Sequence, residues 1–129
     1  MTEHPNAVMV RRSFAAWNSG DLDVIREYVT DDAVYHFAGN NPMSGTYRGL
    51  EAVKDALATV SQGGGPHAEL EALLASDDHV IAFVRVTSER DGETLDVVVA
   101  QAVKVNAEGK ATEAWFLPND QRGYDRFFL

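Results

Sequence analysis

Apolar side chains recur every three or four residues in the first half of the chain, which is the spacing of one face of an α-helix. The first such segment follows Pro5 and places Phe14 and Trp17 on its apolar face. Residues 18–20 break the pattern, and a second, short helix follows Asp21, whose carboxylate lies near the positive end of that helix. Together the two segments predict a helical hairpin.

Two more elements are predicted before the middle of the chain. Residues 33–37 are mostly β-branched or aromatic and are flanked by turn-forming residues, which predicts a short strand. The polar stretch 40–48 is typical of a loop. Apolar residues then return at helical spacing over 50–60, so we expect a third helix that ends at the glycine-rich segment 63–66.

The second half of the chain changes to the period of two that is typical of strands. Asp-, Asn- and Gly-rich connectors suited to tight hairpins separate its apolar runs. We expect antiparallel strands over 68–75, 79–89, 94–105 and 110–117. Residues 1–129 are therefore predicted to form one α+β domain, in which three N-terminal helices pack on a curved, mainly antiparallel sheet.

Composition and charge exclude several classes of partner. The 129 residues are of single-domain size, and 20 Asp plus Glu outnumber 11 Lys plus Arg, for a net charge of -9. Such a surface repels nucleic acids and anionic membranes, so neither is expected as a partner. The chain has no cysteine, and its first ten residues lack both a basic stretch and a long apolar run. We therefore expect a cytoplasmic protein without disulfides.

One polar side chain interrupts the predicted inner face of the strand over 94–105. The odd-numbered residues of this strand are apolar except for Gln101. A buried amide needs a hydrogen-bond partner, so Gln101 is either a satisfied core group or a ligand contact under the helices. On the opposite face Val98, Ala100 and Ala102 are more apolar than a solvated surface, which favours a homodimer through the sheet over coverage by the C-terminal segment.

The position of Trp115 depends on the register of the last hairpin. A three-residue turn would place it opposite Gln101, and a four-residue turn would place Ala114 there instead. Trp115 is thus a pocket wall, a dimer anchor or an ordinary core residue.

Two titratable residues are candidates for proton transfer. His36 lies within a run of aromatic and β-branched residues, where it is either a hydrogen-bonded structural histidine or a general base. Asp120 follows the last strand, near the point where residues 124–128 should close over the helices. It either caps a turn or a short helix or acts as an acid or base. The four histidines lack metal-ligand spacing and no cofactor motif occurs, so we expect neither a metal nor a cofactor.

Several stretches of the sequence carry a family resemblance. Residues 13–22 (SFAAWNSGDL), 31–36 (DDAVYH) and 44–49 (SGTYRG) are similar to the first helix and its AWNxGD break, the first strand and the GxYxG turn of SnoaL-like, ketosteroid-isomerase-like proteins. Residues 113–115 with Asp120 resemble the closing segment of that family. The resemblance implies the nuclear transport factor 2-like fold, a conical barrel around a mostly apolar pocket that is often dimeric through its sheet.

The resemblance does not select a reaction, because the family includes isomerases, polyketide cyclases and epoxide hydrolases. Positions similar to the ionisable groups of ketosteroid isomerase hold Ser13, Phe37 and Gln101, none of which is ionisable in that way. Arg85 lacks the partner carboxylate two residues away that the epoxide hydrolases use. Asp120 is the nearest match to the acid and base of the polyketide cyclases.

Two hypotheses about function therefore remain open. In the first, the chain is a cofactor-free cyclase or isomerase of an apolar, oxygenated, polyketide- or terpenoid-like molecule, with Asp120 or His36 moving the proton. In the second, it is a non-catalytic module that binds a ligand or dimerises. The residues expected to contact the ligand are Trp17, Tyr35, Tyr47, Gln101 and Trp115.

Overall fold

The computed structural model describes residues 3–61 and 66–128, and the predicted glycine-rich break at 63–65 lies outside them. Helices and strands alternate along the chain much as the pattern predicts, with a longer first strand and two elements that were not predicted. In chain order the elements are α1 (Pro5–Ser19), α2 (Leu22–Ile25), β1 (Val29–Phe37), β2 (Gly45–Arg48), α3 (Leu50–Ser61), β3 (His67–Ala75), β4 (His79–Arg90), β5 (Glu93–Val105), β6 (Ala111–Pro118) and α4 (Gln121–Phe128).

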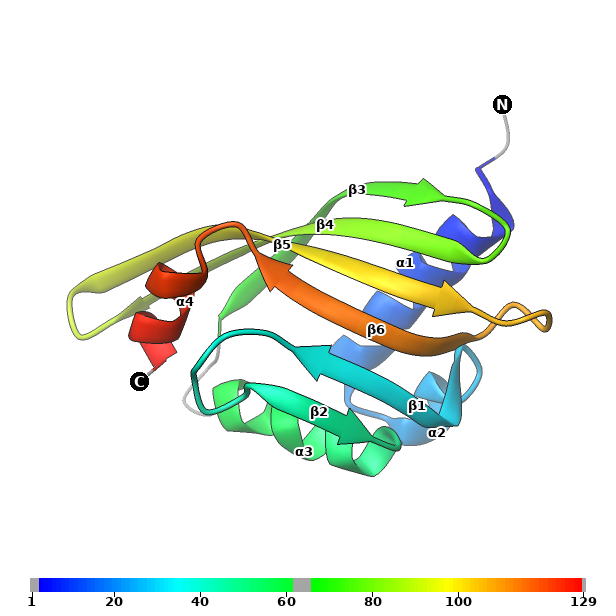
Figure 1. The fold of residues 1–129 in the computed structure, drawn as a ribbon, viewed down its shortest axis with the longest axis horizontal. Helices are drawn as coiled ribbons and strands as arrows, with labels where there is room; N and C mark the ends of the chain where they lie inside the picture. The colour runs from blue at the N-terminus through cyan, green and yellow to red at the C-terminus, as the bar shows by residue number, and fades with distance from the viewer. Residues whose placement is uncertain (1–2, 62–65, 129) are drawn as a thin grey trace.

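The described strands form one mixed sheet in the order β2-β1-β6-β5-β4-β3. Only the contact between β1 and β6 is parallel among these pairs; each of the others is antiparallel. Figure 1 shows the sheet curved, with α1 crossing behind it. The helix α1 packs on β3 and β4, α3 packs on β1 and β2, and α4 packs on β5 and β6. The expected α+β architecture is confirmed, with α4 as an additional helix.

Local sequence explains where the first two helices start and stop. Pro5 begins α1, where a missing N–H costs no helical hydrogen bond, and Nδ1 of His4 accepts the backbone N–H of Asn6 at 3.1 Å. Gly20 ends α1 in the left-handed conformation, at φ 71°. The Asp21 carboxylate then caps α2 by accepting the backbone N–H of Asp23 at 3.0 Å. The helical hairpin is confirmed.

The prediction of a loop over 40–48 is wrong for its second half, which forms the edge strand β2. This strand pairs with β1, with Tyr47 opposite Tyr35 and Thr46 opposite His36. It was missed because it is short and polar, and only one of its side chains packs inward. An edge strand needs no continuous apolar face, so its sequence looks like a loop.

The faces of β5 are as predicted. Its odd-numbered residues from Leu95 to Val105 point inward and are buried, except that Gln101 is only half-buried. The opposite residues Val98, Ala100 and Ala102 are half-buried.

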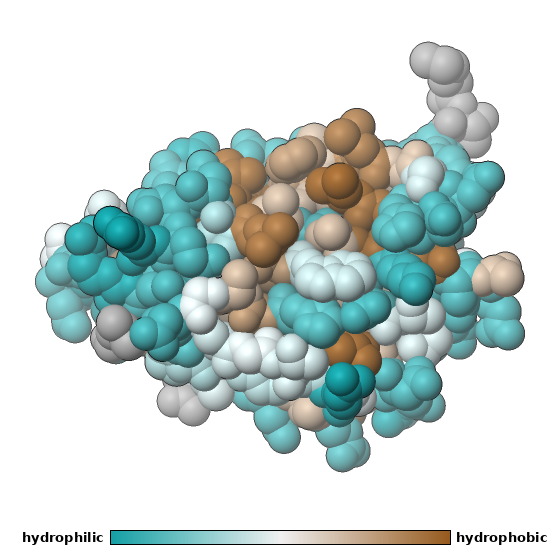
Figure 2. All heavy atoms as spheres, viewed as in Figure 1, coloured by the Kyte–Doolittle hydropathy of each residue, from teal (hydrophilic) through white to brown (hydrophobic). Residues whose placement is uncertain are grey.

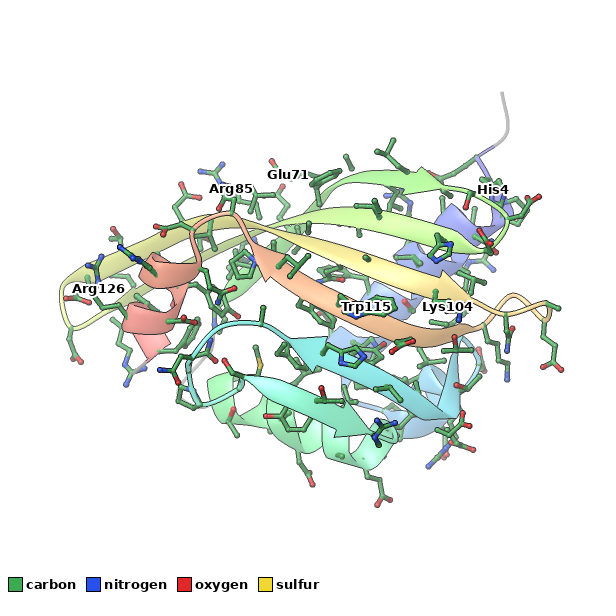
Figure 3. All side chains as sticks on the ribbon, viewed as in Figure 1. His4, Glu71, Arg85, Lys104, Trp115 and Arg126 are labelled. Carbon is green, nitrogen blue, oxygen red and sulfur yellow. The ribbon has the colours of Figure 1, made fainter. Side chains whose placement is uncertain are left out.

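The last hairpin has neither of the two registers considered from the sequence. Gln101 lies opposite Phe116, and Trp115 lies opposite Ala102. The cause is a β-bulge next to the turn, where the pairing skips Thr112. Trp115 therefore lies on the outer face of the sheet, where Figure 3 shows it on the side of β6 turned away from α1. It is not a pocket wall.

The helices in the described ranges are too short or too polar for any of them to cross a lipid bilayer.

Candidate ligand-binding cavity

A cavity of about 250 Å³ lies between the concave face of the sheet and the helices. Valines of β4 and β5 form one wall, Phe37 and Phe116 form another, and Phe14 and Trp17 project toward it from α1. Tyr124 of α4 completes the lining at one end. The cavity exists because the strands alternate, so that large apolar side chains of a curved sheet converge on the same side.

The polar groups on this cavity are all neutral. Every lining residue in the described part of the chain is uncharged, and neither a carboxylate nor an imidazole is among them. The polar side chains that reach the lining are Ser13, Trp17, Asn18, Tyr35, Asn41, Gln101 and Tyr124. A cavity of this kind favours a neutral, mainly apolar molecule, because an ion would lose its hydration without gaining a counter-charge.

Trp17 and Tyr35 form a hydrogen-bonded pair on the cavity wall. The indole Nε1–H of Trp17 donates to the Tyr35 hydroxyl at 3.2 Å, and the two ring centres are 5.6 Å apart. Tyr35 is buried, with 6% of its surface exposed. Burial raises the pKa of its phenol to about 12, against the smaller opposing effect of the Trp17 hydrogen bond. The hydroxyl is therefore neutral across the physiological range.

Gln101 faces the same cavity from β5. Its half-buried side chain has no hydrogen-bond partner among the residues that the structure describes. The apolar neighbours on its strand and on β6 cannot satisfy an amide. Of the two alternatives that the sequence left open, the described residues therefore do not show the first, a core amide that the protein itself satisfies.

The short helix α4 closes one end of the cavity. Asp125 accepts hydrogen bonds from the backbone N–H of Asn40 at 2.9 Å and the side chain of Asn41 at 2.7 Å, both in the loop after β1. Tyr124, the neighbour of Asp125, lines the cavity. Its pKa is raised to about 12, first by burial and then by the Asp125 charge. In the sequence, this helix was indicated only by Asp120 as a possible cap and by the aromatic residues at its end.

The predicted base His36 lies on the other side of the sheet. Because residues alternate along β1, Tyr35 and Phe37 face the cavity and His36 faces outward. Its Nε2 is 2.6 Å from Oε2 of Glu113, its Nδ1 is 2.9 Å from Oγ1 of Thr46, and its ring stacks on Trp115 at 5.4 Å. The structure thus places His36 in a cross-strand cluster and away from the cavity.

Asp120 also lies off the cavity. It is exposed, and its Oδ1 accepts the backbone N–H of Gly123 at 3.0 Å, which caps the start of α4. A Cβ at Gly123 would overlap this carboxylate and displace it from its capping position. Of the two roles considered for Asp120, the structure shows the cap, because its carboxylate caps the helix that carries Tyr124.

The expected ligand contacts divide into two groups. Trp17, Tyr35 and Gln101 line the cavity. Tyr47 does not, because its hydroxyl donates to the Met43 carbonyl at 2.9 Å and its ring packs edge-on against Phe37 behind the lining. Trp115 lies on the outer face, as described above. Three polar residues of the lining were not among the expected ligand contacts: Asn18, Asn41 and Tyr124.

Histidine and carboxylate side chains within residues 3–61 and 66–128 nowhere gather in groups of three that could hold a metal ion.

Comparison with known families identifies the domain. Residues 10–114 match the family model described as SnoaL-like domain. The chain belongs to the SnoaL-like family. Uncharacterized proteins of Mycobacterium bovis and Mycobacterium tuberculosis are 32% identical to it over 115 residues, which is 87% of this chain and 87% of theirs.

Solved structures place the SnoaL-like domain among nuclear transport factor 2-like folds. Bal32a, from a soil-derived mobile gene cassette, is 32% identical, with a TM-score of 0.86 over 97% of both chains. A nuclear transport factor 2-like protein of Burkholderia xenovorans is 21% identical, with a TM-score of 0.81 over 100% of this chain and 99% of that one. The part of this SnoaL-like domain that matches the family model ends before α4, so Tyr124 lies outside the matched residues.

Proposed function

We propose that this SnoaL-like domain binds a small, uncharged, mostly apolar molecule in the cavity between sheet and helices. The observation that carries the proposal is the lining, which combines apolar walls with neutral polar groups and an amide, Gln101, that lacks a partner among the described residues. The volume of about 250 Å³ is just below the ~300–1,000 Å³ typical of pockets for drug-sized ligands. A ligand of one or two fused rings fits this space, and oxygenated polyketide- or terpenoid-like molecules include such compounds.

Binding without acid–base catalysis is the function that the geometry favours. A general acid or base must come within hydrogen-bond reach of the reacting group, directly or through one water. Asp120 and His36 are each held outside the lining, by a helix cap and by a cross-strand cluster. Cyclisation or isomerisation by these two residues therefore has no geometric support, and the binding hypothesis is the one we pursue.

A protein of the same fold contains a ligand. A Mycobacterium tuberculosis protein, 22% identical with a TM-score of 0.68 over 88% of this chain and 93% of that one, was solved in complex with estradiol-17beta-hemisuccinate. At this identity the likeness is one of fold. It supports the proposal only in that this architecture can enclose a small molecule.

The second part of the proposal is a homodimer formed through the outer face of the sheet. Leu74, Ile81 and Leu117 expose 62%, 40% and 51% of their surface there. Cross-strand pairing places Leu74 and Ile81 in one row with Ala102 and Trp115, and Leu117 lies in the adjacent row, opposite Ala100. Figure 2 shows apolar residues gathered over the middle of the sheet and up to its upper edge, with polar residues on either side. An apolar centre with a polar rim is typical of protein interfaces.

Titration with 1-tetralone, a neutral bicyclic ketone, tests the binding proposal. We expect binding by calorimetry, with NMR shift changes confined to residues that line the cavity. Ala82 lines the cavity and is 1% exposed, so Ala82→Leu fills part of the space and should weaken binding by about tenfold or more. The control is Ala58→Leu, which adds the same bulk to an exposed position of α3. Equal affinity in both variants would show that the compound binds elsewhere.

A further inference from the structure

We propose that the Tyr35 hydroxyl is the hydrogen-bond donor that selects ligands with a carbonyl oxygen, and that Trp17 is the positioning residue that fixes it in this role. The inference rests on the proposed function, since it assigns a ligand class to the same cavity.

The first step is the direction of one hydrogen bond. An indole N–H can donate but cannot accept. In the 3.2 Å contact between Trp17 Nε1 and the Tyr35 hydroxyl, the tyrosine oxygen must therefore be the acceptor. The hydroxyl hydrogen of Tyr35 points away from this contact. Among the described residues no acceptor takes it up.

The second step is the place of that hydrogen. Tyr35 lines the cavity, and its ring is fixed by Trp17 on one side and by Phe116 at 5.5 Å on another. Burial keeps the phenol protonated, with its pKa raised to about 12. A neutral donor of fixed direction, with no protein acceptor, is thus presented to whatever occupies the cavity. It forms its bond only if the ligand brings an acceptor.

The third step is the chemistry of that acceptor. A carboxylate or phosphate would enter a cavity whose described lining holds no cation, so an anionic acceptor is disfavoured. A carbonyl oxygen is neutral and accepts strongly, and it can sit on an otherwise apolar ring system that suits the valine and phenylalanine walls. Gln101 lies two strands away and two residues further along the sheet, about 12 Å from Tyr35 by strand geometry, so it can contact a second polar group of the ligand.

The test compares 1-tetralone with tetralin, which has the same two rings and no carbonyl. The measured quantity is the ratio of the two dissociation constants, because it cancels changes in cavity shape. In Tyr35→Phe we expect 1-tetralone to weaken by about tenfold relative to tetralin. In Trp17→Phe the hydroxyl loses its fixed direction, so the ratio should shift in the same direction by a smaller factor.

A spectroscopic signature separates a hydrogen bond from a packing effect. With 1-tetralone labelled with ¹³C at the carbonyl, we expect the carbonyl resonance of the bound compound to move downfield relative to an apolar solvent. Tyr35→Phe should reverse this shift. The control is Tyr47→Phe, which removes a hydroxyl that donates to the Met43 carbonyl and belongs to a residue outside the lining, so both the resonance and the ratio should stay unchanged.

The outcomes distinguish this inference from the proposal beneath it. If both compounds bind in the cavity and the ratio is the same in wild type and Tyr35→Phe, the role of Tyr35 is overturned while the binding function stands. If neither compound shifts the resonances of cavity residues in the wild type, both proposals fall. A change of ratio in Tyr35→Phe that is absent from Tyr47→Phe supports the inference.

Discussion

Asp125 connects α4 to the rest of the molecule through hydrogen bonds to three different residues. It accepts from the Asn40 backbone and the Asn41 side chain in the loop after β1, and from Gln121 within α4 at 2.9 Å. The loop approaches so closely that a Cβ at Gly39 would overlap Gln121 and Asp125. One carboxylate thus fixes the helix that carries Tyr124 over the cavity.

This carboxylate should make the closure of the cavity sensitive to acid. Burial raises the pKa of Asp125, but hydrogen bonds from Asn41, Asn40 and Gln121 outweigh it and lower the pKa below its usual 3.8. A lowered folded-state pKa means that the stabilisation is present above the unfolded-state pKa and is lost as the pH falls through the folded-state value. Hydrogen exchange should therefore show α4 losing protection in acid before β4 and β5 do.

Asp125→Ala should reproduce the acid state at neutral pH. We expect a loss of about 1–2 kcal/mol in the free energy of unfolding and faster exchange of the α4 amides. Asp32→Ala, at an exposed position with no described side-chain hydrogen bond, is the matched control. Identical exchange of α4 in the two variants would contradict this account of Asp125.

For single residues, the sequence predicts aromatic and polar candidates for the cavity wall, but it does not predict on which face of the sheet each side chain lies. Trp17, Tyr35 and Gln101 were predicted to contact a ligand, and all three line the cavity. His36 and Trp115 are equally conspicuous in the sequence, but each lies one position away from an inward-facing residue. A strand reverses its side chains at every step, so the face depends on a register that tertiary pairing decides.

Among the secondary-structure elements, β1, β2 and β6 are connected by the side chain of His36. It extends from β1 to Glu113 of β6 and Thr46 of β2, and it stacks on Trp115. The contact with β6 is the parallel one in the sheet, and β2 is an edge strand, so both are places where backbone pairing alone gives less support. The cluster therefore stabilises the weaker side of the sheet.

His36→Ala should lower the free energy of unfolding by about 1–2 kcal/mol, because the stack and the bond to Glu113 are both lost. Denaturant unfolding of His36→Ala, Glu113→Ala and the double variant measures the coupling between the two side chains. His79→Ala, which removes a more exposed imidazole, is the control. Strictly additive losses in the cycle would show that the 2.6 Å contact contributes nothing.

Elements with strong periodicity were predicted well, and the weakly patterned ones were not. The long amphipathic segments that became α1, α3 and β3 to β6 bury one face each, and this burial imposes the pattern that the sequence displays. By contrast, β2 has four residues, and α4 has polar residues and a glycine in its first turn. Both are held by contacts from distant parts of the chain, and local sequence does not record such contacts.

At the scale of the whole molecule, the acidic surface opposes the proposed dimer while the apolar patch favours it. Each copy carries a net charge of -9, so two copies repel each other at long range. Salt screens this repulsion and leaves apolar burial largely intact. We therefore expect the dimer dissociation constant, measured by analytical ultracentrifugation, to fall as the ionic strength rises. A dimer held mainly by ion pairs would show the reverse.

A charge placed in the patch should separate the copies. Ile81 is 40% exposed in the middle of the outer face, and in a two-fold dimer Ile81→Asp introduces one carboxylate from each copy into a surface that must lose its water. We expect Ile81→Asp to sediment as a monomer at concentrations where the wild type is dimeric. Val24→Asp is the matched control, because Val24 is 37% exposed but lies on α2, away from the patch. Wild-type protein that is monomeric at every concentration would remove the dimer, while the cavity, enclosed within one chain, would keep its proposed function.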